Sequence, residues 1–578
     1  MLLPNLRLAG SSQQMLQEFR GYNHNLRIRE GEWYNEQNFM SEDYPVLTTR
    51  RQRREITTLS RPAGCIVKDA MAVVDGTDVI YNGNTIDMGL SIAETMCPKQ
   101  LISMGAYLLI WPDKKFLNTQ DFSDKGSMEN SFAANGTVTI KLARADGSEF
   151  GSYVTGTTAP QNPANGDLWM DTSNEAVPVL KEWSEYSAMW VTIPTTYIKI
   201  SAGGIGVGFE QYDGVEIAGL TGSAEEFNGS HVIYAKDDGW IVVVGIMTTA
   251  QITQTGGLTV KRAVPDMDFV TECGNRVWGC KYGMVDGKPV NEIYASKLGD
   301  FKNWSCYMGL ATDSFAAGRG SDGVFTGAIT HLGHPLFFKE NCIEKVYPSS
   351  AGAHQIVTVE GRGVQKGCWR SLAIVGETLY YKSRVDVCAF TGSLPGSVSD
   401  ALGDETYTDA RAGAVGGLYY ISMKDSADAW HLFVYDTEKG IWHRQDATQA
   451  MMFCTMDGEL FYIDEASGKV YGCGGADSGD IPWSIESGVI GFDLAENEYI
   501  SRFVVRCDTL GSVHLEVQYD EGGPWLDRGS YTGSGLGSFV LPVAPRRCDH
   551  LRLRFSGDKA IKIYSITKYM ERGSDTMW

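Results

Sequence analysis

The feature that most constrains this chain is a short phrase that recurs between residues 325 and 475: a turn glycine, then a leucine followed by two aromatic residues. Successive copies lie about 40 residues apart, and a period of about 40–45 residues is typical of the four-stranded blade of a β-propeller. Each copy is rich in aromatic residues and too short for a helix. The repeat therefore predicts that each copy is an inner strand of one blade; the four leucines are Leu336, Leu379, Leu418 and Leu460.

Weaker copies of the same pattern lie earlier in the chain. Residues 65–81 form a strand–turn–strand pattern around Asp75-Gly76, and residues 106–111 are an apolar run after a glycine. The pattern returns at residues 275–296. Counting these hairpins predicts five to seven blades.

Two turns share an acidic residue followed by a tryptophan: Asp300 with Trp304, and Asp436 with Trp442. They resemble the Asp-box turns of sialidase propellers. We expect the carboxylate to cap the turn and the tryptophan to fill the gap between blades. These are structural roles rather than catalytic ones.

The repeat spacing fails after Asp121 and resumes near Asp266, which predicts an inserted β-domain at residues 121–262. Its phrase Asn162-Pro163 to Trp169 is followed by Trp183 and Trp190, and it resembles a short module of phage fibre and tail proteins. The tryptophans are interpreted as a small hydrophobic core; stacking on a sugar is the alternative.

The rest of the chain gives an all-β, multidomain layout. Residues 1–60 are polar and irregular and are expected to form an N-terminal arm, with residues 38–49 extended rather than packed. The first propeller strands are expected at 61–120 and the remaining blades at 263–480. Alternating apolar and polar residues predict a C-terminal antiparallel β-sandwich, jelly-roll-like, at 481–578.

The formal net charge is −21. Such a surface does not adhere to nucleic acid over most of its area, because phosphate binding depends on Lys and Arg. The charge is explained either by simple solubility or by an acidic wall past which DNA slides. Composition does not separate the two.

One basic cluster stands out in this acidic chain: Arg50, Arg51, Arg53 and Arg54. It is a candidate contact to DNA or to an acidic neighbouring subunit. A solvated loop is the alternative.

No catalytic, cofactor or metal motif is found. The 12 cysteines contain no C-x-x-C pair, and no nucleophile elbow, zinc helix or phosphate loop with its lysine is present. We expect a protein that is not an enzyme and has no cofactor. The sequence also lacks an apolar run of about 18 residues and a secretion-signal layout, so assembly in the cytoplasm is expected.

The layout of arm, interrupted propeller and C-terminal β-domain resembles the tail nozzle proteins of short-tailed bacteriophages, which include the packaged-DNA stabilisation proteins. Residues 326–402 carry the likeness best. The resemblance implies a structural virion protein that assembles as a ring, typically a homohexamer, around the DNA exit channel. Its partners would be itself, the portal or adaptor, other tail proteins and the genomic DNA. The alternative from another class is a receptor-binding or glycan-hydrolysing propeller protein of a phage tail.

Overall fold

The computed structural model describes residues 11–92, 98–491, 498–520, 522–544 and 550–572. These residues form strands and turns, with three short 3₁₀ helices: η1 (Gly222–Phe227), η2 (Trp369–Ser371) and η3 (Asp400–Leu402). The contacts divide the chain into two compact units. One comprises Met1–Pro98, Leu336–Glu344 and Thr358–Trp578, and the other comprises Lys99–Pro335 and Lys345–Val357.

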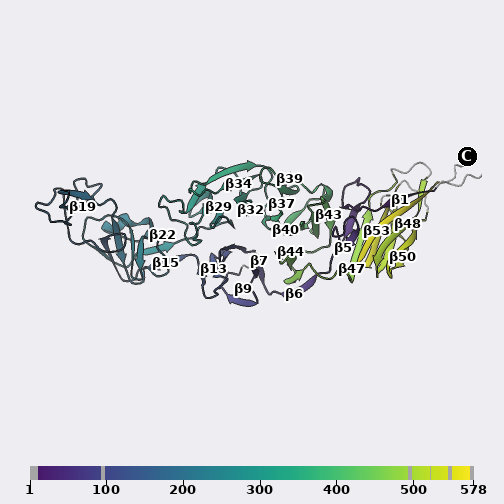
Figure 1. Ribbon diagram of the computed structural model, residues 1–578, viewed down its shortest axis with the longest axis horizontal. Helices are drawn as coiled ribbons and strands as arrows, with labels where there is room; N and C mark the ends of the chain where they lie inside the picture. Colours follow the sequence, from purple (N-terminus) through teal and green to yellow (C-terminus); the bar gives the residue numbers. More distant parts are fainter. Residues whose placement is uncertain (1–10, 93–97, 492–497, 521, 545–549, 573–578) are drawn as a thin grey trace, which may run out of the picture. The chain divides into compact units, whose positions relative to one another are not determined.

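The first unit holds four propeller sheets of four antiparallel strands each (Figure 1). In spatial order they are β10 (Asn84–Asp87), β9 (Asp78–Tyr81), β8 (Ala70–Asp75) and β7 (Pro62–Lys68); β36 (Ala373–Val375), β37 (Thr378–Lys382), β38 (Val387–Phe390) and β39 (Gly396–Ser397); β40 (Thr408–Val415), β41 (Leu418–Lys424), β42 (Trp430–Asp436) and β43 (Ile441–Arg444); and β44 (Ala450–Met456), β45 (Glu459–Asp464), β46 (Lys469–Gly472) and β6 (Arg54–Thr58).

The second unit holds two further sheets of this kind. They are β11 (Gln100–Met104), β12 (Tyr107–Trp111), β13 (Lys115–Asn118) and β14 (Lys125–Ser127), and then β28 (Phe269–Glu272), β29 (Val277–Val285), β30 (Lys288–Ala295) and β31 (Phe315–Gly318). A seventh sheet has its residues divided between the units: β32 (Gly327–His331), β33 (His334–Phe338), β34 (Cys342–Tyr347) and β35 (Gln355–Glu360).

The four repeated leucines occupy equivalent places. Leu336, Leu379, Leu418 and Leu460 lie in β33, β37, β41 and β45, and each of these is the second strand of its four-stranded sheet. The leucines at 336, 379 and 460 are buried. The prediction of a β-propeller whose phrases form inner strands is therefore confirmed, and seven such sheets occur among the described residues.

The last propeller sheet is completed from the N-terminal side of the chain. β6 pairs antiparallel with β46, and the chain then runs directly into β7, the first strand of the first sheet. Between these two sheets a cluster of buried apolar side chains includes Leu59, Val73 and Ile463. The pairing covers the edge of β46, which would otherwise present unpaired backbone groups.

Both acidic turns have the predicted construction. The backbone N–H groups of Glu438 and Lys439 donate to the Asp436 carboxylate at 3.1 and 3.0 Å. Trp442 is 2% exposed, and its indole N–H donates to the Val398 carbonyl in the loop after β39, at 2.7 Å. In the second unit, Trp304 is buried with side chains of β11, β12 and β28. Each tryptophan thus fills the space between two sheets.

The inserted β-domain consists of three sheets around one apolar core. They are β15 (Asn130–Ala133), β27 (Thr259–Arg262), β22 (Gly214–Ala218) and β23 (Gly229–Val232); β24 (Ala235–Asp237), β25 (Trp240–Val244), β21 (Tyr197–Ser201), β16 (Thr137–Ala143) and β26 (Ile252–Thr255); and β17 (Tyr153–Gly156), β18 (Leu168–Asp171), β19 (Val179–Ser184) and β20 (Met189–Thr192).

The C-terminal domain is a sandwich of two six-stranded sheets, antiparallel except for the β2–β3 pair, and five N-terminal strands belong to it. One sheet has β4 (Phe39–Met40), β5 (Leu47–Thr49), β53 (Ile561–Arg572), β48 (Glu498–Thr509) and β51 (Gly535–Pro542), with β1 (Ser11–Leu16) also on β53. The other has β2 (Gly21–Tyr22), β3 (Glu32–Gln37), β47 (Asp480–Ser487), β52 (Leu551–Lys559), β49 (Ser512–Tyr519) and β50 (Trp525–Thr532).

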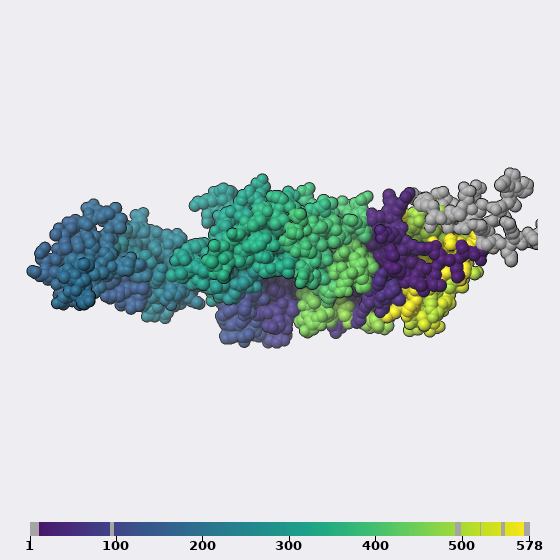
Figure 2. Space-filling model, turned by 45° about the horizontal axis from the view of Figure 1, so that its top comes forward, coloured from purple at the N-terminus to yellow at the C-terminus, as the bar shows by residue number. Residues whose placement is uncertain are grey.

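The expectation that residues 38–49 form an unpacked arm is wrong. Phe39 and Leu47 are 0% and 1% exposed and belong to the sandwich core, with Trp483 and Ile563 among their neighbours there. Figure 2 shows the N-terminal residues, in purple, lying against the yellow C-terminal strands. Burial of these apolar side chains holds the N-terminal strands in place.

Candidate functional site

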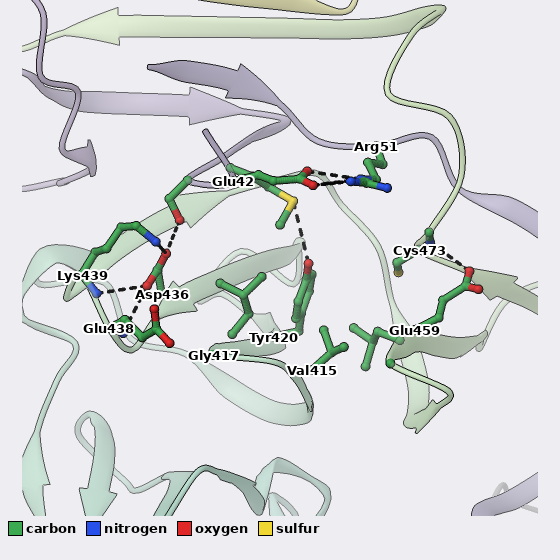
Figure 3. A pocket seen from close by; sticks show the side chains of 16 residues that line it. Glu42, Arg51, Val415, Gly417, Tyr420, Asp436, Glu438, Lys439, Glu459 and Cys473 are labelled. Atoms are coloured by element: carbon green, nitrogen blue, oxygen red, sulfur yellow. Dashed lines mark hydrogen bonds and ion pairs between the residues drawn. The ribbon is translucent and has the colours of Figure 1, made fainter. Parts of the chain in front are cut away.

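A cavity of about 470 Å³ lies where the N-terminal segment meets the turns of the last two propeller sheets (Figure 3). Residues after β4 form one side, and the β40–β41, β42–β43 and β44–β45 turns form the other. Four carboxylates line it, together with one arginine and one lysine: Glu42, Asp436, Glu438, Glu459, Arg51 and Lys439.

Asp436 is the most buried of these carboxylates, at 3% exposure. Besides the two backbone N–H groups of its turn, it accepts hydrogen bonds from the Ser41 hydroxyl and from Lys439 Nζ, the latter at 2.7 Å. Burial by itself would raise the pKa of Asp436, but the hydrogen bonds from Lys439 and Ser41 outweigh it, so the pKa lies below its ordinary value. Asp436 is therefore held as an anion.

Two other carboxylates of the cavity are also paired. Glu42 forms an ion pair with Arg51, and Glu459 accepts from Arg54 at 2.9 Å and from the Gly474 backbone N–H at 2.9 Å. Glu438 is exposed, and its carboxylate makes no hydrogen bond to another described residue.

Arg53, two residues after Arg51, is held by contacts with residues of the propeller. Its guanidinium lies 2.8 Å from the Asp446 carboxylate, and only 11% of its side chain is exposed. It also donates to Gln445 at 3.0 Å and to the Tyr462 hydroxyl at 3.2 Å, and lies 5.3 Å from the Tyr462 ring centre. Burial favours a raised pKa for Asp446, but the charges of Arg53 and Arg50 and a hydrogen bond from Thr448 hold it below its ordinary value.

Each of the four arginines predicted to contact DNA or a subunit lies close to an acidic side chain of the same chain. Arg50 lies 3.5 Å from Asp446, Arg51 pairs with Glu42, and Arg54 begins β6 and pairs with Glu459. The solvated-loop alternative is wrong for Arg53, whose side chain is enclosed. Arg51 and Arg54 keep 47% and 57% of their side chains exposed, so contact to DNA or another subunit stays a prediction for these two.

Sequence reasoning missed the partners of these arginines. Gln445 and Glu459 lie 392 and 405 residues along the chain from Arg53 and Arg54. No local spacing marks such pairs; only the pairing of β6 with β46 brings them together.

Contacts at the cavity join the N-terminal segment to the propeller turns, through Ser41 with Asp436 and Arg54 with Glu459. A general acid at neutral pH needs a carboxyl whose pKa is raised, and the pKa of Asp436 is lowered. Three of the four carboxylates are neutralised by cations of the same chain. Within the described residues, no group of three or more His, Cys, Asp or Glu side chains is placed to hold a metal ion.

A second candidate surface lies in the inserted domain, on the sheet β17–β20. The Trp190 ring lies 5.6 Å from that of Trp169 and 5.5 Å from that of Trp183, in edge-on contacts, and Lys181 Nζ lies 4.9 Å from the Trp169 ring centre. Trp169 is buried, while Trp183 and Trp190 are half-buried. The core interpretation therefore holds for Trp169, and the other two rings retain exposed surface.

No protein family model and no curated protein matches the chain. Solved structures that resemble it include BamB from Moraxella catarrhalis, at 11% identity and a TM-score of 0.29, covering 74% of this chain and 97% of that one. The phage phi92 endosialidase is similar at 10% identity and a TM-score of 0.24, covering 90% and 74%. An exo-β-1,3-galactanase from Phanerochaete chrysosporium is similar at 11% identity and a TM-score of 0.21, covering 52% and 94%.

These similarities concern the fold, and no conclusion on function rests on them. Among the helices of the part of the chain that the structure describes, none is long and apolar enough to cross a bilayer.

Proposed function

We propose that this protein is a structural component of a bacteriophage tail, of the nozzle type. In this proposal, copies of the chain assemble into a ring, most simply a hexamer, and the ring forms a channel that retains packaged DNA and releases it at ejection. The portal or adaptor and the other tail proteins are its neighbours in the virion. The chain acts mechanically and not as an enzyme.

The observation that carries this proposal is the interlocking of the N-terminal segment within the first unit. Residues 11–49 supply strands to both sheets of the sandwich, and β6 then completes the last propeller sheet. The ion pair of Arg53 with Asp446, whose side chains are 11% and 22% exposed, holds this segment against the propeller. A channel protein that transmits force needs a rigid connection between its domains, because a flexible hinge would bend under that force.

The acidic composition supports the DNA part of the proposal. With a net charge of −21, a channel wall built from these surfaces repels phosphates at short range, so that DNA is not retained by adhesion. The exposed faces of Arg51 and Arg54 are cationic groups that a neighbouring subunit could contact.

The test is to purify the full chain and determine its mass by mass photometry and its shape by negative-stain imaging. We expect closed rings with an open centre. The double variant Arg51→Ala/Arg54→Ala should weaken the rings, and the exposed Arg61→Ala serves as the matched control. A monomer that persists at all accessible concentrations would contradict the proposal.

A second function, contact with a glycan at the tail surface, is favoured by the aromatic sheet β17–β20. Trp183 and Trp190 are half-buried, and Tyr186 beside them is fully exposed. Glycan-array binding lost in Trp190→Ala but retained in Asp436→Asn would support binding through this sheet. Hydrolysis of a bacterial glycan that is lost in Asp436→Asn or Glu438→Gln would instead identify an enzyme.

A further inference from the structure

The C-terminal sandwich contains a second cavity, of about 510 Å³, which opens between its two sheets. Its walls are apolar side chains of the sandwich core and its margin, among them Trp33, Phe503, Leu553, Phe555, Ile566 and Ile490. Five of these, Trp33, Phe503, Leu553, Phe555 and Ile566, are between 2% and 6% exposed. Side chains of the hydrophobic core therefore form part of the cavity lining.

The segment Leu26–Glu30 forms the mouth of this cavity, and its apolar and basic residues alternate. Ile28 packs against Gly488 so closely that a Cβ atom at Gly488 would lie 2.6 Å from it. Arg27 and Arg29 line the cavity and are exposed. No hydrogen bond or ion pair joins either guanidinium group to another residue that the structure describes.

The acidic residues at the mouth, by contrast, are engaged. Glu30 pairs with Lys568 at 3.4 Å, and Glu32 accepts from the Asn23 amide at 2.8 Å and from the Arg29 backbone N–H at 2.7 Å. Neither arginine forms an ion pair within the described part of the chain, and together with Lys568 they outnumber the carboxylates of Glu30 and Glu32 among the lining residues.

We propose that this cavity binds a single-chain amphiphile with an anionic head, such as a fatty acid, with the alkyl chain between the sheets and the carboxylate at Arg27 and Arg29. A guanidinium binds a carboxylate through two parallel hydrogen bonds, which suits an anionic head better than a neutral one. The alkyl chain would replace water along the apolar walls formed by residues such as Phe503, Phe555 and Ile566. This inference does not depend on the proposed tail function.

An apolar peptide is a poorer occupant. Every buried residue of a peptide brings a backbone N–H and a C=O that need partners. The backbone groups of the β47, β48 and β52 segments are engaged in the sandwich ladders. The walls thus have few groups to satisfy a peptide backbone, whereas an alkyl chain needs none.

The test uses the full-length protein and isothermal titration calorimetry with hexanoate, octanoate and decanoate below their micelle-forming concentrations, and with decanol. Burial of each added methylene should tighten binding about fourfold. Decanoate should bind about tenfold more tightly than decanol.

Two variants separate the parts of the site. The double variant Arg27→Ala/Arg29→Ala changes two exposed side chains. It should abolish the preference for decanoate over decanol, while decanol still binds. Val489→Trp, at the cavity wall, should weaken both ligands at least tenfold. Arg506→Ala, an exposed arginine of β48 in the same sandwich, is the matched control and should change neither affinity.

Any of these results would overturn the proposal: affinity that does not depend on chain length, an unchanged preference for decanoate without Arg27 and Arg29, or tighter binding of an apolar pentapeptide with a free carboxylate than of decanoate. Retained binding in Val489→Trp would place the ligand elsewhere and overturn it as well. Circular dichroism of each variant establishes that it is folded before it is titrated.

Discussion

Replacing Arg53 by alanine is the sharpest test of how the N-terminal segment is held to the propeller. The substitution removes the 2.8 Å ion pair with Asp446 and the hydrogen bonds to Gln445 and Tyr462. It leaves the Asp446 carboxylate, which is only 22% exposed, with Arg50 at 3.5 Å as its remaining cation.

The expected magnitude follows from this geometry. Removing one partner of a buried ion pair lowers the free energy of unfolding by about 3–5 kcal/mol. Because Arg50 remains and Asp446 keeps some solvent contact, we expect the lower end, about 3 kcal/mol. Arg54→Ala is the matched control: its side chain is 57% exposed, and an exposed pair contributes about 0–1 kcal/mol.

Amide hydrogen exchange measures this effect locally, in peptides that cover β6 and β46. A loss of about 3 kcal/mol in the free energy of opening corresponds to roughly 100-fold faster exchange, and the Arg54→Ala control should change it only a few-fold. Equal acceleration in the two variants, or none in Arg53→Ala, would refute the conclusion that the buried pair anchors β6.

Substitutions at three further positions test other packing and polar contacts within the first unit. Trp442→Ala opens a cavity between two sheets and removes the hydrogen bond to Val398; it should lower the free energy of unfolding by about 3–5 kcal/mol in denaturant titrations, and Trp442→Phe by about 1 kcal/mol. Gly21 has φ of +72° and a Cβ there would lie 2.3 Å from the Trp442 carbonyl oxygen, so Gly21→Ala should cost more than about 1 kcal/mol, whereas the same change at the open turn Gly76 should cost less. Burial raises the pKa of Glu36 above 4.5, against the opposing effect of His443, so the folded state binds this proton more tightly and stability falls as pH rises from about 4.5 through the raised pKa. In Glu36→Gln that fall should disappear from the pH profile of the denaturation midpoint, and a profile identical to the wild type would contradict the assignment.

The propeller was predictable because its evidence is local and repeated. Each blade must place a leucine and two aromatic rings on one strand after a turn, so the same phrase returns at Leu336, Leu379, Leu418 and Leu460. The turn at Asp436 was predictable for the same reason, since a carboxylate that caps a turn lies within a few residues of the N–H groups it accepts from.

The role of the N-terminal segment was not predictable in this way. Its strands β2 and β4 have two residues each, too few to show an alternating pattern. The other strands of the segment pair far along the chain, β1 and β5 with β53 and β3 with β47, and the partners of Arg53 and Arg54 lie about 400 residues away. The polar composition suggested a solvated arm, whereas the four arginines of the segment are paired with acidic side chains of the same chain.

These long-range pairings also explain why the segment takes the path it does. A propeller sheet that ended at β46 would leave an open edge, and a sandwich without β4 and β5 would leave the apolar side chains beside β53 uncovered. The N-terminal segment covers both. Phe39 and Leu47 pack in the core of the sandwich, and β6 then pairs with β46 at the edge of the propeller sheet. Because the Arg53–Asp446 pair lies between these two closures, loss of that pair should loosen β6 while the sandwich strands stay protected. Coupled exchange of both regions would instead mean that the N-terminal segment unfolds as one cooperative element.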